Sequence, residues 1–274
     1  MSVIRVQNLS KRYGEEDVLK EINFAIEEGE FVVLLGASGC GKTTILKMIN
    51  KIIPLTKGFI EVQDRNISEW NTIELRRSIG YVIQQIGLFP HMTIEANIAY
   101  VLSIMGVKKA DYHQRARELC ELVGLDATFL GRHPHQLSGG QGQRIGVARA
   151  LAANPDIVLM DEPFGAVDEI TRRYLQDELK RIHSKLKKTF LFVTHDIEEA
   201  LYLGNRIILI KDGEIEQIGT PEEIIFQPKS DYVKSFFGIK GFKASLPEER
   251  MKDLYEAILS GEMTLSEALD GFDL

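Results

Sequence analysis

The chain has 274 residues, of which 44% are hydrophobic and 27% are charged, a composition typical of a soluble globular protein with one large domain or one domain and a small appendage. A formal charge of −7 argues against a globally basic nucleic-acid-binding protein. Two cysteines, Cys40 and Cys120, are too few for a disulfide framework or a cysteine-rich zinc site. No apolar run approaches the ~18 residues of a spanning helix and no signal-peptide pattern opens the chain, so we expect a soluble protein of a reducing compartment.

The first part of the chain is predicted to form strands. Residues 4–6 and 22–26 alternate between apolar and polar side chains, as half-buried strands do. Residues 31–35 form a continuous apolar run that ends in glycine, a pattern typical of a strand buried on both faces. A helix is predicted from about Thr43 to Ile53, ending at Pro54.

A helical segment is predicted from Glu95 to Leu151, because apolar residues recur there at spacings that line one helix face. Strands and helices then alternate, which favours a parallel sheet covered by helices. The predicted elements of this second part are strands at 157–160, 190–193 and 206–211, and a helix at 172–186.

The last part of the chain has a different pattern. Residues 245–248 read as a capping box, and apolar residues at helical spacing follow it as far as Gly261. A second cap, at Thr264, precedes another short apolar pattern. We therefore expect a helical tail over residues 241–274.

A phosphate-binding loop is the strongest signal in the sequence. Residues 36–43, GASGCGKT, match G-x-x-x-x-G-K-[ST] in full and lie between a buried strand and a helix. Glycines let the backbone wrap around phosphates, and the following helix adds its positive N-terminus. Lys42 supplies a cation to the β- and γ-phosphates, and Thr43 offers a hydroxyl to Mg²⁺. The loop and the residue after it predict a nucleoside triphosphate site made of Gly36, Ser38, Gly39, Cys40, Gly41, Lys42, Thr43 and Thr44.

Two later strands end in polar residues that suit the same site. The strand at 157–160 runs into Asp161 and Glu162, and the strand at 190–193 runs into Thr194 and His195. Because ligands of open α/β sheets lie at the carboxyl ends of the strands, we predict that Asp161 holds Mg²⁺. Glu162 would orient or deprotonate the attacking water, and His195 would contact the γ-phosphate and help to fix that water.

Residues 137–144, LSGGQGQR, open a further helix. Ser138 caps it and two glycines leave its first amides bare, which predicts a second phosphate site that a partner chain would use. With this segment the chain resembles the ATP-binding-cassette (ABC) ATPases over about residues 2–240. The resemblance implies a P-loop NTPase (RecA-like) α/β fold: a mixed sheet core, an N-terminal antiparallel β part and an inserted α-helical subdomain at about residues 92–153. It also implies a homodimer, arranged head to tail, that hydrolyses ATP with Mg²⁺.

The resemblance assigns further residues. Tyr13 matches the aromatic residue that stacks on adenine, and Asp168 matches an aspartate at the dimer seam. Gln84 matches the glutamine that touches Mg²⁺ and couples to the membrane partner. The motif residues that would act on the partner's ATP are Ser138, Gly139, Gly140 and Gln141. The predicted catalytic residues are Glu162, His195, Lys42 and Gln84, and the predicted metal ligands are Thr43, Gln84 and Asp161.

The run at residues 81–93, YVIQQIGLFPHMT, is similar to the cassettes that energise import of quaternary-amine osmoprotectants such as glycine betaine, carnitine and choline. Importers of amino acids or polyamines are the next alternative. The implied partners are integral membrane permease subunits and, indirectly, a substrate-binding protein, with no nucleic acid. The implied location is the cytoplasmic face of the membrane. Residues 241–274 are too few for the paired CBS modules of many such relatives.

Two other classes of protein are alternatives to a transport ATPase. Cassette ATPases of chromosomes carry long coiled coils, and those of ribosomes fuse two cassettes, so one intact cassette argues against both. A nucleotide-binding subunit without turnover is the other alternative. The presence of both Glu162 and His195 argues against it.

Overall fold

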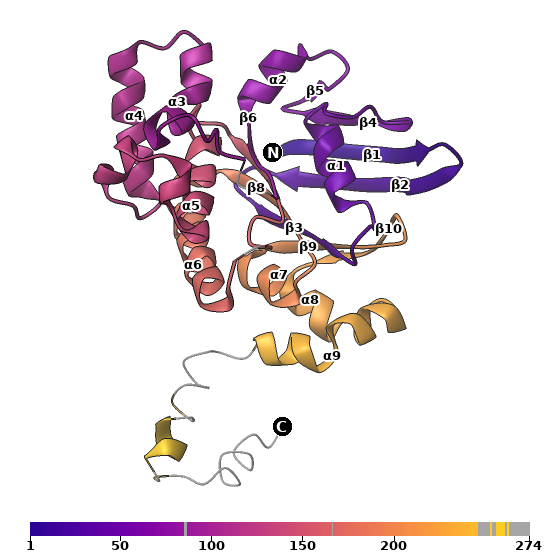
Figure 1. Ribbon diagram of the computed structural model, residues 1–274. Coiled ribbons are helices and arrows are strands. Elements are labelled where there is room, and N and C mark those ends of the chain that lie inside the picture. The colour runs from indigo at the N-terminus through magenta and orange to yellow at the C-terminus, as the bar shows by residue number, and fades with distance from the viewer. Residues whose placement is uncertain (85–86, 166, 246–252, 254–255, 261, 263–274) are drawn as a thin grey trace.

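The computed structural model describes residues 1–84, 87–165, 167–245, 253, 256–260 and 262. Two sheets form the centre of the molecule, and helices pack around the larger one (Figure 1). The smaller sheet has four antiparallel strands in the order β2-β1-β4-β5. Its strands are β1 (Ser2–Tyr13), β2 (Glu16–Glu27), β4 (Lys57–Val62) and β5 (Arg65–Asn66). This sheet is the predicted N-terminal antiparallel part.

The larger sheet has six strands in the order β10-β9-β3-β8-β7-β6. Neighbouring strands are parallel except β10, which runs antiparallel to β9. The strands are β3 (Phe31–Gly36), β6 (Ile79–Val82), β7 (Ile157–Asp161), β8 (Thr189–Thr194), β9 (Arg206–Lys211) and β10 (Glu214–Gly219). Because β3, β7 and β8 are adjacent and parallel, the residues that follow them lie at one edge of the sheet.

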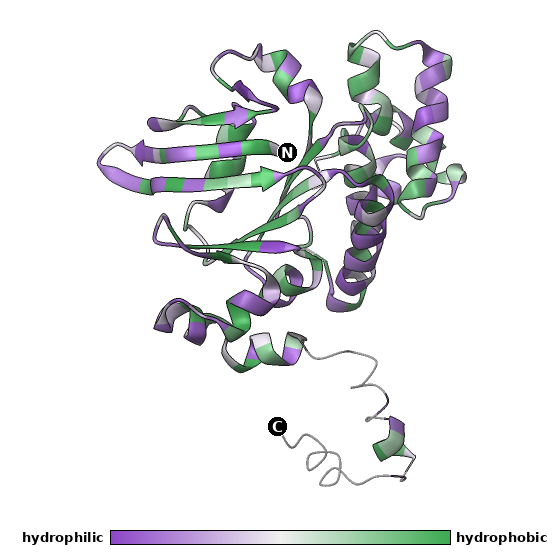
Figure 2. Ribbon diagram, turned by 180° about the vertical axis from the view of Figure 1, so that it is seen from behind, coloured by the Kyte–Doolittle hydropathy of each residue, from purple (hydrophilic) through white to green (hydrophobic). Residues whose placement is uncertain are grey.

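Both faces of this sheet are buried, as the continuous apolar runs predict. Along β3, Val33 and Leu35 face the helices α5, α6 and α7, while Val32 and Leu34 face α1 and the antiparallel sheet. Every residue of β3, β7 and β8 is buried. Hydrophobic residues gather in these strands, whereas α6, which buries only one face, is largely hydrophilic (Figure 2). The strand ends are therefore held by cores on both sides.

The helices fall into groups by their place in the chain. Three of them, α3, α4 and α5, lie between β6 and β7 and gather at one end of the molecule, as the predicted fold class requires (Figure 1). Two 3₁₀ turns, at residues 127–131 and 134–136, join them. The helices are α1 (Lys42–Ile49), α2 (Thr72–Ser78), α3 (Ile94–Ile104), α4 (Lys109–Leu122), α5 (Gly139–Ala150), α6 (Glu169–Leu186), α7 (Ile197–Leu203), α8 (Pro221–Phe226) and α9 (Asp231–Ser245).

Helix α1 is shorter than predicted. It ends at Ile49, four residues before the predicted end at Ile53. Lys51 has a left-handed φ of 49°, and the amide of Ile52 donates to the carbonyl of Lys47 at 2.7 Å. This is a Schellman turn, whose hydrogen bonds satisfy the last carbonyls of the helix. The helix therefore ends before it reaches Pro54, the residue that was predicted to end it.

Helix α6 starts earlier than predicted, at Glu169 and not at about Arg172, because Asp168 caps it. The domain boundaries at 92–153 and 241–274 remain predictions. The cap predicted at Thr264 lies outside the described residues, as do Leu246–Glu248 of the capping box. Within the described residues, no helix is both long enough and apolar enough to cross a bilayer.

Candidate nucleotide site

The phosphate-binding loop lies between β3 and α1, and two of its glycines are required by close packing. At Gly36 an added Cβ would lie 2.2 Å from the carbonyl oxygen of Ile210 on β9. At Gly41, where φ is +100°, it would lie 2.4 Å from a Leu19 methyl group on β2. The contact at Gly36 is with backbone and cannot be relieved, and at Gly41 the positive φ adds to the contact with Leu19, so the path of the loop depends on glycine at both positions.

The first turn of α1 is prepared for an anion. Gly41, its N-cap, provides no side-chain cap, and no acidic residue lies in the first turn. The first amides of a helix have no partners within the helix, and the helix dipole makes this end positive. The arrangement therefore suits the phosphate-binding N-terminus that the motif predicts.

Lys42 is the charged residue of the loop, and it is only 4% exposed. Its Nζ donates to the carbonyls of Gly36 and Ala37, both at 2.8 Å, and lies 3.7 Å from Cys40 Sγ. The ammonium group is thus held inside the curve of the loop, where a phosphate would meet it. Burial raises the pKa of the Cys40 thiol, which is the opposite of the shift that a reactive cysteine needs.

Thr43 and Asp161 come together as predicted for a magnesium site. The Thr43 hydroxyl donates to Asp161 Oδ1 at 2.6 Å. Asp161 ends β7 and is 5% exposed, and burial raises the pKa of its carboxyl group. Hydroxyl and carboxylate oxygens are hard ligands, and Mg²⁺ commonly uses one or two such protein ligands with water and phosphates in the remaining positions. The residues present therefore fit Mg²⁺ bound together with a nucleotide.

Two other predicted residues contact the carboxylate of Glu162. Its Oε2 accepts a hydrogen bond from Gln84 Nε2 at 3.2 Å and lies 3.2 Å from His195 Nδ1. The amide of Glu162 donates to the carbonyl of Val193 at 3.0 Å, so β8 fixes its backbone. The φ of Glu162 is 42°, a left-handed conformation that a residue with a side chain adopts only under constraint. Backbone strain of this kind gathers at functional sites.

Tyr13 ends β1 and is 49% exposed, and Lys11 Nζ lies 4.7 Å from the centre of its ring. Its predicted stacking on adenine remains a prediction. A hollow of about 430 Å³ lies beside the phosphate loop, lined by Val18, Ser38 and Tyr232 among others. Space for part of a ligand is therefore present next to the loop.

The LSGGQ segment is a complete capping box. The Ser138 hydroxyl accepts from the amide of Gln141 at 3.3 Å, and the Gln141 side chain accepts from the amide of Ser138 at 2.9 Å. The sequence pattern predicted the serine cap, whereas the glutamine half was missed. The S-x-x-Q spacing is itself the signal that could have found it.

Asp168 has a local role as well. It caps α6 by accepting from the amide of Thr171 at 3.0 Å, and this hydrogen bond holds the pKa of its carboxyl below the ordinary value. Its predicted place at a dimer seam remains a prediction, as do the roles of Ser138, Gly139, Gly140 and Gln141 toward a partner.

One buried carboxylate near the site was missed altogether. Glu199, in α7, is 5% exposed and accepts from the Thr194 hydroxyl at 2.6 Å. Arg172 Nε lies 3.9 Å from its other oxygen. Burial raises the pKa of the Glu199 carboxyl. Nothing in the one-dimensional pattern separates this glutamate from the exposed Glu198 beside it.

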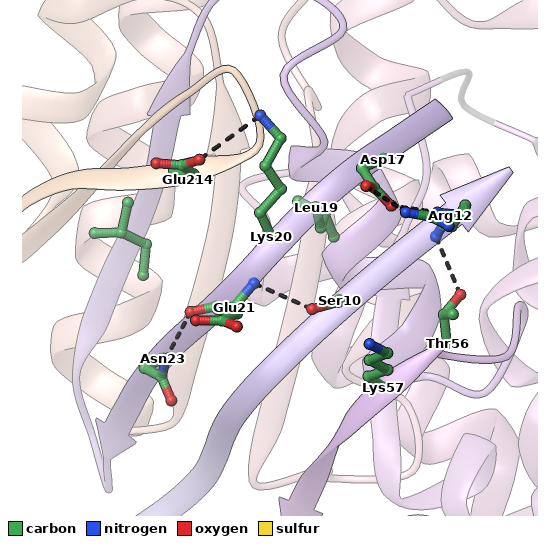
Figure 3. A pocket seen from close by; sticks show the side chains of 11 residues that line it. Ser10, Arg12, Asp17, Leu19, Lys20, Glu21, Asn23, Thr56, Lys57 and Glu214 are labelled. Atoms are coloured by element: carbon green, nitrogen blue, oxygen red, sulfur yellow. Dashed lines mark hydrogen bonds and ion pairs between the residues drawn. The ribbon is translucent and has the colours of Figure 1, made fainter. Parts of the chain in front are cut away.

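A second polar hollow, of about 650 Å³, lies over β1, β2 and β10 and is separate from the phosphate loop (Figure 3). Arg12 pairs there with Asp17 at 2.6 Å, and Lys20 pairs with Glu214 at 3.6 Å. Cations and carboxylates thus neutralise one another across this surface. It does not have the net charge that would select a phosphate.

Comparison with known proteins shows the family of the chain. The sequence profile of the family described as ABC transporter matches residues 19–165. The glycine betaine/carnitine/choline transport ATP-binding protein OpuCA of Bacillus subtilis (strain 168) is 47% identical over 272 residues, which span 97% of this chain and 72% of OpuCA. The glycine betaine uptake system ATP-binding protein YehX of Escherichia coli (strain K12) is 44% identical over 279 residues, 98% of this chain and 90% of YehX.

A solved structure agrees with the fold. The dimeric post-hydrolysis structure of the ATP-binding cassette MJ0796, bound to ADP and Pi, matches with a TM-score of 0.70 and 37% sequence identity, covering 79% of this chain and 98% of that chain. The match covers more than half of the chain in sequence and in structure, and the phosphate loop and the Asp161–Glu162 strand end lie inside the residues that the family profile covers. The chain therefore belongs to the ABC transporter family and is one of its ATP-hydrolysing cassettes.

Proposed function

We propose that this chain is the ATPase subunit of an importer for quaternary-amine solutes such as glycine betaine, carnitine and choline. The observation that carries the substrate class is kinship, because OpuCA and YehX, at 47% and 44% identity, are named for these solutes. The observation that carries hydrolysis is the Glu162 carboxylate with His195 and Gln84 around it.

In this proposal two chains bind two molecules of ATP between them, head to tail. The phosphate loop and Lys42 hold the phosphates, and Thr43 and Asp161 hold Mg²⁺, which supplies positive charge to the phosphate oxygens. Glu162 orients or deprotonates the water that attacks the γ-phosphate. His195, whose Nδ1 lies 3.2 Å from Oε2 of Glu162, keeps this carboxylate in place. The contact of His195 with the γ-phosphate remains a prediction. The amides at the start of α5 complete the partner's site.

The proposed membrane partners are permease subunits that dock on the helical insert near Gln84. An exposed apolar side chain supports this place, since Ile83, which directly precedes Gln84, is 38% exposed. A partner that covers Ile83 would also reach the glutamine that contacts Glu162. The proposed location is the cytoplasmic face of the membrane.

The first experiment is sedimentation of the Glu162→Gln variant with and without Mg·ATP, beside phosphate release by the wild type. An ATP-dependent dimer of the variant and steady hydrolysis by the wild type support the proposal. A variant that binds ATP and stays monomeric, with a wild type that does not hydrolyse, contradicts an autonomous ATPase.

The substrate class needs its own experiment. Deletion of the gene in its own host, followed by uptake of labelled glycine betaine, carnitine, choline, an amino acid and a polyamine, separates the two importer classes. Loss of quaternary-amine uptake alone supports the proposal. Loss of amino acid or polyamine uptake alone contradicts it.

A further inference from the structure

The two glycines of the LSGGQ segment have different surroundings. An added Cβ at Gly139 would meet nothing within 4 Å, and Gly139 is exposed. An added Cβ at Gly140 would lie 2.5 Å from Thr171 Cγ2, in the first turn of α6. Heavy atoms do not approach so closely, so the absence of a side chain at Gly140 is explained inside the same chain.

Thr171 also contacts the other predicted element of the dimer seam. Its amide donates to Asp168 Oδ1 at 3.0 Å. Its methyl group lies against Gly140, so one residue joins residues 167–168 before α6, here called the Asp168 loop, to the first turn of α5. The contact continues one turn further along α6, where the Tyr174 ring lies 5.3 Å from the guanidinium of Arg144 on α5.

We infer that Thr171 is a positioning residue, which sets where the amides at the start of α5 stand relative to Asp168 and the nucleotide site of the same chain. This inference rests on the proposed function, in which those amides serve the ATP bound by the partner. The contact makes the α5 start and the Asp168 loop one rigid unit. The start of α5, which would reach the partner's ATP, is then held in a fixed place relative to the nucleotide site of the same chain.

The test removes a single atom. Serine at position 171 keeps the backbone amide and the hydroxyl and lacks only Cγ2. The next Thr171 atom, Cβ, is 4.0 Å from the position that an added Cβ at Gly140 would take, which is ordinary van der Waals contact. Alanine at position 140 should therefore fit once Cγ2 is gone.

Five variants are made in the Glu162→Gln background. They are Gly140→Ala, Thr171→Ser, the Gly140→Ala/Thr171→Ser pair, Gly139→Ala, and the Gly139→Ala/Thr171→Ser pair. Each is measured for melting temperature, for nucleotide affinity of the monomer and for Mg·ATP-dependent dimerisation by sedimentation.

We expect Gly140→Ala to melt about 3 °C or more below the Glu162→Gln parent, because overpacking is destabilising. We also expect its dimer dissociation constant to rise at least about tenfold, which is ~1.4 kcal/mol, with monomer affinity for ATP unchanged. Adding Thr171→Ser to Gly140→Ala returns the dimer dissociation constant to within about threefold of the parent value. It also returns the melting temperature to within about 1 °C of the parent. Adding Thr171→Ser to Gly139→Ala does not reverse any weakening, since position 139 does not meet Thr171.

Three results overturn the inference. Gly140→Ala as stable as the parent shows that Thr171 does not occupy the place of the added Cβ. A Gly140→Ala/Thr171→Ser pair that recovers its melting temperature but not its dimer shows that the nucleotide in the partner, and not Thr171, requires glycine. A Glu162→Gln parent that does not dimerise overturns the proposed function and with it the positioning role, and the melting temperatures then still decide whether the contact exists.

Discussion

Loss of the Glu162 carboxylate should slow ATP hydrolysis far more than loss of the residues that hold it. A positioned general base contributes about 10²–10⁴-fold to rate, so Glu162→Gln should lower kcat by that factor, or ~2.7–5.5 kcal/mol of the barrier. His195→Ala removes the contact of 3.2 Å between His195 Nδ1 and Glu162 Oε2. The His195 side chain is 54% exposed, so solvent screens this contact, and ~0.2–1 kcal/mol, up to about fivefold in rate, is expected.

His195 acts on hydrolysis through its contact with Glu162 Oε2, the oxygen that Gln84 also contacts. The losses of activity in Glu162→Gln and His195→Ala are therefore predicted not to be additive. The Glu162→Gln/His195→Ala double variant should hydrolyse ATP within about twofold of Glu162→Gln alone. His195→Asn, whose amide can donate from nearly the position of Nδ1, is the matched control and should keep more activity than His195→Ala. The assay is phosphate release at saturating Mg·ATP. Effects that multiply in the double variant would show that His195 acts on the nucleotide directly and would refute the reasoning.

Three further predictions follow from single residues. Tyr13→Ala should weaken the binding of ATP and GTP by about 5–100-fold, because a stacking ring contacts only the base. The binding of inorganic tripolyphosphate should stay unchanged. Calorimetry with the three ligands checks this prediction. Thr43→Val removes the hydroxyl that bonds Asp161 and should raise the Mg²⁺ concentration for half-maximal hydrolysis by about tenfold or more, whereas Thr43→Ser should not, as a magnesium titration would show. Because burial raises the pKa of Glu199 above 4.5, the folded chain binds the proton more tightly than the unfolded chain, and stability from this group falls as pH rises through the folded pKa. Glu199→Gln should therefore gain stability over the wild type at pH 8 relative to pH 5 in urea unfolding, and an equal difference at both pH values would contradict the shift.

The sequence predicted the phosphate loop and its strand-helix context because each residue there has a strict local reason. Glycine is required at positions 36 and 41 because atoms of β9 and β2 lie close to them. The motif nevertheless contains glycine at both positions, so it predicts them without information about these neighbours. The buried strands were predictable for a similar reason, since apolar runs can only be accommodated where both faces are covered. Topology then brings the ends of β7 and β8 to one edge, which the alternation of strands and helices already implied.

The remaining features depend on contacts between distant segments. The helix end at Ile49 follows from a left-handed Lys51, which no propensity favours. Residues 57–82 form two short strands, a helix and an edge strand that the sequence pattern did not predict. The grouping of Gln84 and His195 on one oxygen of Glu162 needs three segments of the chain to meet. The strand ends already implied that Glu162 and His195 share one edge of the sheet, whereas only the resemblance to a family suggested that Gln84 belongs to the same site.

The local roles found for the motif residues change how their substitution should be interpreted. Ser138 and Gln141 cap one helix, and Asp168 caps another, so each serves the fold of its own chain before any partner binds. Loss of a cap costs ~0.5–2 kcal/mol, and loss of activity in an alanine variant at these positions therefore does not by itself identify a nucleotide contact. Asparagine caps as well as aspartate does and lacks the charge. A comparison of Asp168→Asn with Asp168→Ala thus separates the cap from the carboxylate, and the same logic explains why Gly140 can be tested only together with Thr171.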